Sequence, residues 1–243
     1  MGSEWSCPCA DREKIRRKLT PDHETESGEN ESNLSLIIKS IPPKKLEKAI
    51  KTPVNNYILS SISKHPIQNK PLLMYQKNSD LEYSYSSENS FKLSQQTFDT
   101  SNSLAENIKE KCLTGYVLIG GYSDTKNLHL VYYETKEKYE RQLVVIMENF
   151  IDLQELKKIF IEHQDHLYIG SIEHNESVLI IFEKSVTPRP LKYLVADYPI
   201  TSEQEPDFEF NLEDTINECT RNKEVRFRGC LAFKTSLFLI FIE

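Results

Sequence analysis

Four segments of this chain share one layout, and this repetition limits the folds available to the sequence more than any other feature. Three of the segments contain two apolar stretches around a short polar turn, a pattern that predicts a β-hairpin. The paired stretches are 116–123 with 128–134, 167–173 with 178–183, and 225–232 with 237–243. A more diverged pair occupies 57–63 and 72–76. Such self-similarity is typical of a repeat architecture, in which neighbouring units share their hydrophobic core.

A small residue marks the same place in the first strand of each hairpin. These structural repeat positions are Ser60, Gly120, Gly170 and Gly229. A candidate helix start lies 17 or 18 positions before each of them, at Pro42, Ser103, Asp152 and Asn211. Glu106 and Glu155 follow two of these starts at the spacing of a capping box, and proline suits the first turn of a helix. The small residues indicate a kinked strand or a close backbone approach where the helix packs on the sheet. A contact point for a ligand backbone is the alternative.

Another candidate strand precedes each helix, so the repeating unit is strand–helix–strand–strand. The sequence therefore predicts an α+β fold of four tandem, pseudo-symmetric repeats, with helices packed on antiparallel or mixed sheets. The repeats span roughly 33–77, 80–136, 141–184 and 191–243. The hairpin strands are apolar on both faces, so we expect both sides of each sheet to be covered. The sequence is compatible with a closed ring and with two pseudo-twofold halves.

The first nineteen residues have the features of a membrane anchor. Gly2 with Ser6 fits the pattern of N-myristoylation, and Cys7 and Cys9 are placed for S-palmitoylation. A basic cluster that would favour an anionic leaflet follows, formed by Arg12, Lys14, Arg16, Arg17 and Lys18. The segment resembles the doubly acylated N-termini of eukaryotic peripheral membrane proteins. A remnant of an expression vector and a metal-binding Cys-Pro-Cys are the alternatives.

Residues 20–32 are acidic and polar, which predicts a disordered spacer between the 1–19 anchor and a folded domain at 33–243. The net charge of −7 argues against sequence-independent binding to nucleic acid. The chain has no secretory signal and no apolar run of the roughly 18 residues that cross a bilayer. We therefore expect the protein at the cytoplasmic face of a membrane, held peripherally by lipid.

Few residues in the body suggest chemistry. His163, Asp165 and His166 could share a cation with His174, although histidine is also common at a solvated helix end. Cys230 follows Gly229 and could be a nucleophile in a Cys–His hydrolase, whereas cysteines in apolar stretches are usually small core residues. On balance the sequence predicts no catalytic residue, no metal site and no cofactor.

The anchor and the lack of a catalytic set together predict a lipid-anchored scaffold or adaptor that acts through protein–protein interaction. Its expected partners are the cytosolic leaflet of a membrane and another protein. Two alternatives stay open. One is a membrane-delivered hydrolase that uses a cysteine and a histidine, and the other is a structural component of a membrane skeleton or cilium.

Overall fold

The computed structural model describes most of the chain from residue 36 onward. The described residues are 36–52, 54, 57–68, 70–77, 84–92, 100–123, 127–134, 142–149, 151–174, 177–184, 190–200, 207–221 and 225–243. The predicted acylation sites, the basic cluster and the acidic spacer lie outside these ranges.

The described elements follow one order four times, and we number the resulting segments units 1 to 4. Unit 1 contains β1 (Leu36–Ser40), the short turn η3 (Pro43–Lys45), α2 (Leu46–Lys51), β2 (Tyr57–Lys64) and β3 (Pro71–Lys77). Unit 2 contains β4 (Ser84–Lys92), α3 (Thr100–Leu113), β5 (Tyr116–Ser123) and β6 (Asn127–Glu134). Unit 3 contains β7 (Leu143–Glu148), α4 (Leu153–Glu162), β8 (His166–His174) and β9 (Ser177–Lys184). Unit 4 contains β10 (Tyr193–Tyr198), α5 (Phe208–Thr220), β11 (Arg226–Phe233) and β12 (Ser236–Ile242).

Each unit forms its own three-stranded sheet, with the last strand of the unit in the middle. The strand orders are β1-β3-β2, β4-β6-β5, β7-β9-β8 and β10-β12-β11. Every pairing is antiparallel, as in β8 with β9 and β7 with β9. The predicted α+β class is confirmed, and the described pairings include no parallel strands, so the sheets are not mixed.

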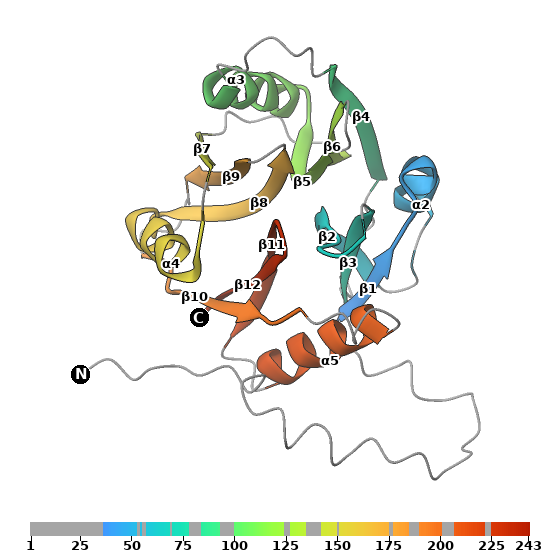
Figure 1. Ribbon diagram of the computed structural model, residues 1–243. Coiled ribbons are helices and arrows are strands. Elements are labelled where there is room, and N and C mark those ends of the chain that lie inside the picture. The colour runs from blue at the N-terminus through green and yellow to red at the C-terminus, as the bar shows by residue number, and fades with distance from the viewer. Residues whose placement is uncertain are drawn as a thin grey trace.

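The four sheets meet around a common centre (Figure 1). The second strand of each unit is innermost: β2 contacts β5, β5 contacts β8, β8 contacts β11, and β11 returns to β2. The helices lie at the perimeter, and each contacts the first strand of the following unit, so that α5 of unit 4 contacts β1 of unit 1. These contacts join the last unit to the first and close a ring.

The position of the helices explains why the hairpin strands are apolar on both faces. In β9, Val178, Ile180 and Phe182 belong to a core with Leu156 and Phe160 of α4. The alternate residues Leu179 and Ile181 belong to the neighbouring core with α3. Because side chains alternate between the faces of a strand, each sheet is covered by two helices. One is its own helix and the other is the helix of the preceding unit.

The helix starts agree with the sequence patterns in two of the four units. Asp152 caps α4, because its Oδ1 accepts from the amides of Gln154 at 2.8 Å and Glu155 at 2.9 Å. Pro43 opens the helical turn that precedes α2. The predicted starts at Ser103 and Asn211 are wrong, since α3 begins at Thr100 and α5 at Phe208. Each helix begins three residues before its predicted start. Ser103 therefore lies in the first turn of α3, and Asn211 lies in the first turn of α5.

Candidate functional site

Each inner strand contains a β-bulge at the same place. The pairing register shifts between Leu59 and Ser61, Leu118 and Gly120, Tyr168 and Gly170, and Phe227 and Gly229. The bulged residues are therefore Ser60, Ile119, Ile169 and Arg228. This register places Ser61, rather than Ser60, at the position equivalent to the three glycines. The small-residue pattern was therefore one residue out of register in unit 1.

The small residues lie where inner strands of different units approach one another. A Cβ built on Gly170 of β8 would lie 3.1 Å from the Cα of Gly120 in β5. A Cβ built on Gly120 would lie 3.0 Å from Cγ2 of Ile62 in β2. The expected backbone approach is thus between neighbouring sheets, and the prediction that it occurs between helix and sheet is wrong. The inner strands approach so closely at the centre of the ring that Gly120 and Gly170 leave no room for larger side chains.

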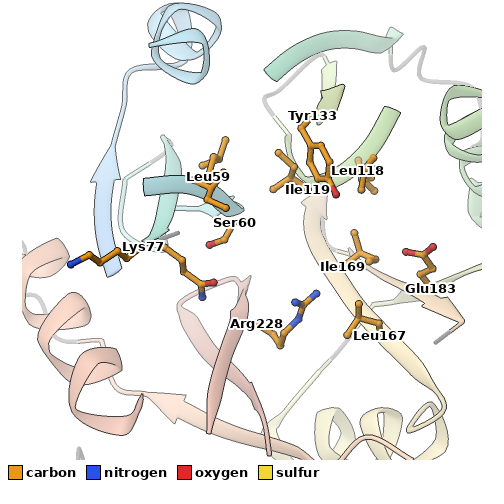
Figure 2. A pocket seen from close by; sticks show the side chains of 13 residues that line it. Leu59, Ser60, Lys77, Leu118, Ile119, Tyr133, Leu167, Ile169, Glu183 and Arg228 are labelled. Atoms are coloured by element: carbon orange, nitrogen blue, oxygen red, sulfur yellow. The ribbon is translucent and has the colours of Figure 1, made fainter. Parts of the chain in front are cut away.

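A cavity of about 400 Å³ lies beside these contacts at the centre of the ring (Figure 2). All four bulged residues line it, together with aliphatic side chains from β2, β5 and β8. The polar part of its lining consists of Ser60, Gln76, Lys77, Tyr133, Glu183 and Arg228. A bulge redirects a side chain away from the regular alternation of a strand, and this directs four side chains from four units into one space.

Arg228 is the bulged residue with a charge. Its side chain is half-buried and extends into the space between Ser60 of β2 and Ile169 of β8 (Figure 2). Its Nη2 donates to the carbonyl oxygen of Tyr168 at 3.2 Å. Its Nε is buried and has no hydrogen-bond acceptor within the described part of the chain. Burial lowers the pKa of Arg228, although a guanidinium stays charged in proteins.

Polar contacts hold the strand that carries Arg228 on both sides. The side-chain amide of Gln76 in β3 donates to the carbonyl oxygen of Phe227 at 2.9 Å. The hydroxyl of Tyr168 lies 3.1 Å from the carbonyl oxygen of Cys230 and 3.1 Å from Oγ of Ser171. Burial raises the pKa of Tyr168, which is therefore a neutral donor. The backbone around Arg228 is thus fixed by units 1 and 3.

Cys230 is a buried core residue. Its Sγ lies 3.8 Å from Sδ of Met74, and burial raises the pKa of the thiol to about 12. The nucleophilic form of cysteine is the thiolate, which a raised pKa suppresses at neutral pH. This environment is the opposite of the one that a Cys–His hydrolase needs at Cys230. Cys219 is half-buried on α5, against the core between units 4 and 1.

The histidine cluster lies at the end of α4. His163 is the C-cap of the helix and stacks on Phe182 with 5.1 Å between the ring centroids. Nδ1 of His166 lies 2.6 Å from Oδ1 of Asp165, and that histidine lowers the pKa of the carboxyl. Burial and the neighbouring His166 lower the pKa of His163. Among the residues that the structure describes, no three histidine, cysteine or acidic side chains are grouped so that they could hold a metal ion.

No protein-family model matches this chain, and searches of curated proteins and of solved structures also gave no match. In the described ranges, no helix combines the length and the apolar character needed to cross a bilayer.

The sequence patterns did not single out Arg228 or the cavity. A signal was present, because the inner strands have Ile119 and Ile169 at the positions equivalent to this arginine. A charged residue at the bulge of one repeat is visible once the four inner strands are aligned by their bulges. The alignment on Gly120, Gly170 and Gly229 already places the three bulged residues before them in register, so the register error in unit 1 did not hide the arginine.

Proposed function

We propose that this protein is a lipid-anchored scaffold or adaptor at the cytoplasmic face of a membrane, and that its body binds another protein. The observation that carries the proposal is the joint presence of Gly2, Cys7 and Cys9 with five basic residues in the first nineteen positions. A single myristoyl chain binds membranes weakly and reversibly, so a stable anchor requires a second signal. Palmitoylation at either cysteine and the basic cluster would each supply one.

We further propose that units 1 to 4 are pseudo-symmetric copies of one repeat. Three observations support this interpretation. The succession of elements is the same, the bulge falls at the same place in each inner strand, and each helix contacts the first strand of the next unit. A ring of four copies is stiff, because no unit can move without disturbing two cores. Stiffness of this kind suits a body that presents fixed surfaces to a partner.

Two exposed apolar side chains on the perimeter are the candidates for contact with a protein partner. Ile161 on α4 exposes 68% of its surface, and Phe210 on α5 exposes 66%. Aromatic residues such as Phe210 often anchor protein interfaces. The two helices belong to neighbouring units, so one partner could contact both.

The anchor is tested by metabolic labelling with alkyne analogues of myristate and palmitate. The wild-type chain should incorporate both labels and sediment with membranes. Gly2→Ala should lose the myristate label and the membrane fraction, and Cys7→Ser/Cys9→Ser should lose the palmitate label. A wild-type chain that incorporates neither label would overturn the lipid-anchor proposal.

The adaptor function is tested by site-specific photo-crosslinking in cells. A photoreactive residue at Phe210 or Ile161 should give one discrete heterologous adduct of defined mass. The matched control is Lys158 on α4, whose side chain is 75% exposed but charged. Equal, diffuse products from all three positions would contradict the assignment of these residues. A discrete adduct between two copies of this chain would instead favour the structural component of a membrane skeleton or cilium.

A further inference from the structure

We propose that the central cavity binds a small aliphatic monocarboxylate, and that Arg228 is the residue that anchors its carboxylate. This inference goes beyond the proposed function, because it rests on the folded ring alone and does not depend on the anchor or on a protein partner.

Arg228 has a hydrogen-bond donor, Nε, that lacks an acceptor among the described residues. A guanidinium carries five N–H donors in a rigid planar fork. Among the described residues, Nη2 donates to the carbonyl oxygen of Tyr168. Nε is buried without an acceptor among the described residues, and a buried donor that lacks an acceptor is costly. A carboxylate in the cavity would accept from this fork through both oxygens, which is the geometry that arginine favours.

The charged side chains of the lining limit the charge that a ligand can carry. The charged residues of the lining are Arg228, Lys77 and Glu183. The side chain of Lys77 is exposed and points away from the cavity (Figure 2), so the charges beside the cavity are one positive, on Arg228, and one negative, on Glu183. Glu183 already interacts electrostatically with Arg228, and its negative charge would oppose a dianion such as a phosphate monoester. The electrostatics therefore disfavour a ligand with two negative charges more than a ligand with one.

The apolar part of the lining limits the shape and polarity of the rest of the ligand. The wall that faces Arg228 is aliphatic and comes mainly from β5 and β8, with Leu118, Ile119, Leu167 and Ile169 (Figure 2). It offers mainly aliphatic contact, and the aromatic ring of the lining is that of Tyr133, beside Ile119 and Leu118 (Figure 2). At about 400 Å³ the cavity is near the small end of the range for sites that bind small molecules. These properties together fit a short aliphatic chain attached to one carboxylate.

Arg228 is the one cation among the four bulged residues of the inner strands. The equivalent positions in units 1, 2 and 3 hold Ser60, Ile119 and Ile169, so the bulge itself requires no charge. Packing alone would favour an aliphatic residue here, because removal of a cation from water is expensive unless it is paired. A ligand carboxylate would give Nε the acceptor that the described residues do not provide.

The test uses the full-length protein with hexanoate as the probe and with methyl-labelled isoleucine for NMR. Hexanoate should shift the methyl signals of Ile119 and Ile169 in a saturable manner, whereas Ile161 on the perimeter should not shift. Hexan-1-ol has the same chain without the charge and should bind at least tenfold more weakly. Hexyl phosphate should also bind more weakly than hexanoate.

Variants of Arg228 distinguish its specific contact with the carboxylate from general electrostatic attraction. Arg228→Met should weaken hexanoate binding at least tenfold. The matched control Arg226→Met, at an exposed position two residues earlier in β11, should bind as wild type does. If Arg228→Met fails to fold, Arg228→Lys keeps the charge but not the planar fork and should bind severalfold more weakly. The proposal would be wrong if hexanoate caused no saturable shift in the wild type, or if hexanol bound as tightly as hexanoate. It would also be wrong if hexyl phosphate bound more tightly, or if a folded Arg228 variant bound hexanoate as the wild type does.

Discussion

A Cβ built on Gly229 would lie 2.7 Å from Oγ of Ser61, so the last inner strand of the ring packs directly against the first. Gly229 has a φ of +147°, a backbone conformation that residues with a side chain rarely adopt. Strand β11 of unit 4 and strand β2 of unit 1 are separated by most of the folded chain. Their contact is the point at which the ring closes, and it leaves no room for a methyl group.

Gly229→Ala should therefore lower the free energy of unfolding by about 2–4 kcal/mol, through backbone strain and overpacking. Denaturant unfolding of the purified protein measures this change. In a Ser61→Gly background the same substitution should cost at least about 1 kcal/mol less, because the nearest atom is gone while the φ strain stays. An identical cost in both backgrounds would show that Ser61 does not limit the space at Gly229.

Asp152→Ala should destabilise the protein by about 1 kcal/mol, because the amides of Gln154 and Glu155 lose the carboxylate that caps α4. Thermal or denaturant unfolding monitored by circular dichroism measures the loss. Asp152→Asn keeps an acceptor at the cap and should retain most of the stability. A loss of the same size in both variants would assign the effect to charge rather than to capping.

Glu213→Gln should change how stability depends on pH. Oε2 of Glu213 on α5 accepts from the amide of Ile38 in β1 at 3.0 Å, and burial raises the pKa of this carboxyl above its ordinary value of 4.5. A raised pKa in the folded state means that the native protein binds this proton more tightly than the unfolded chain does. The stability that protonation contributes is complete below pH 4.5 and is lost as pH rises through the raised pKa.

The variant has no such proton to lose, and its amide oxygen can still accept from Ile38. The difference in unfolding free energy between variant and wild type should therefore shift in favour of the variant as pH rises through this window, and then become constant. Denaturant unfolding at several pH values from 4 to 8 measures it. A difference that is flat with pH, or that shifts toward the wild type, would contradict the raised pKa.

Cys230 should resist alkylation in the native protein. With a pKa of about 12, only about one thiol in ten thousand is ionised at pH 8, and the side chain is 1% exposed. Mass spectrometry after iodoacetamide treatment should find Cys230 unmodified until denaturant is added, while the half-buried Cys219 reacts sooner. Rapid native labelling of Cys230 would restore the Cys–His hydrolase as a serious alternative.

Local patterns predicted the secondary structure well where the pattern was strong. The hairpin strands that end in Lys184 and Ile242 come from long runs of β-branched and aromatic residues, and the structure places strands there. Helix starts were less predictable, because Ser103 and Asn211 have capping chemistry but lie in the first turns of helices that begin earlier. Whether a polar residue caps a helix depends on where the preceding chain is held, which spacing does not specify.

The sequence by itself determined the repeating strand–helix–strand–strand order, the two-sided apolar strands and the anchor-like first nineteen residues. These features are local, since periodicity, turn residues and motif spacing act over a few positions. Only the tertiary structure decided that α5 reaches β1, that the glycines face neighbouring strands, and that Arg228 points into a common cavity. Such relationships depend on contacts between different units, which join residues from 50 positions apart (Gly120 and Gly170) to 175 positions apart (Ile38 and Glu213). In addition, a single bulge moves the side chains that follow it onto the opposite face.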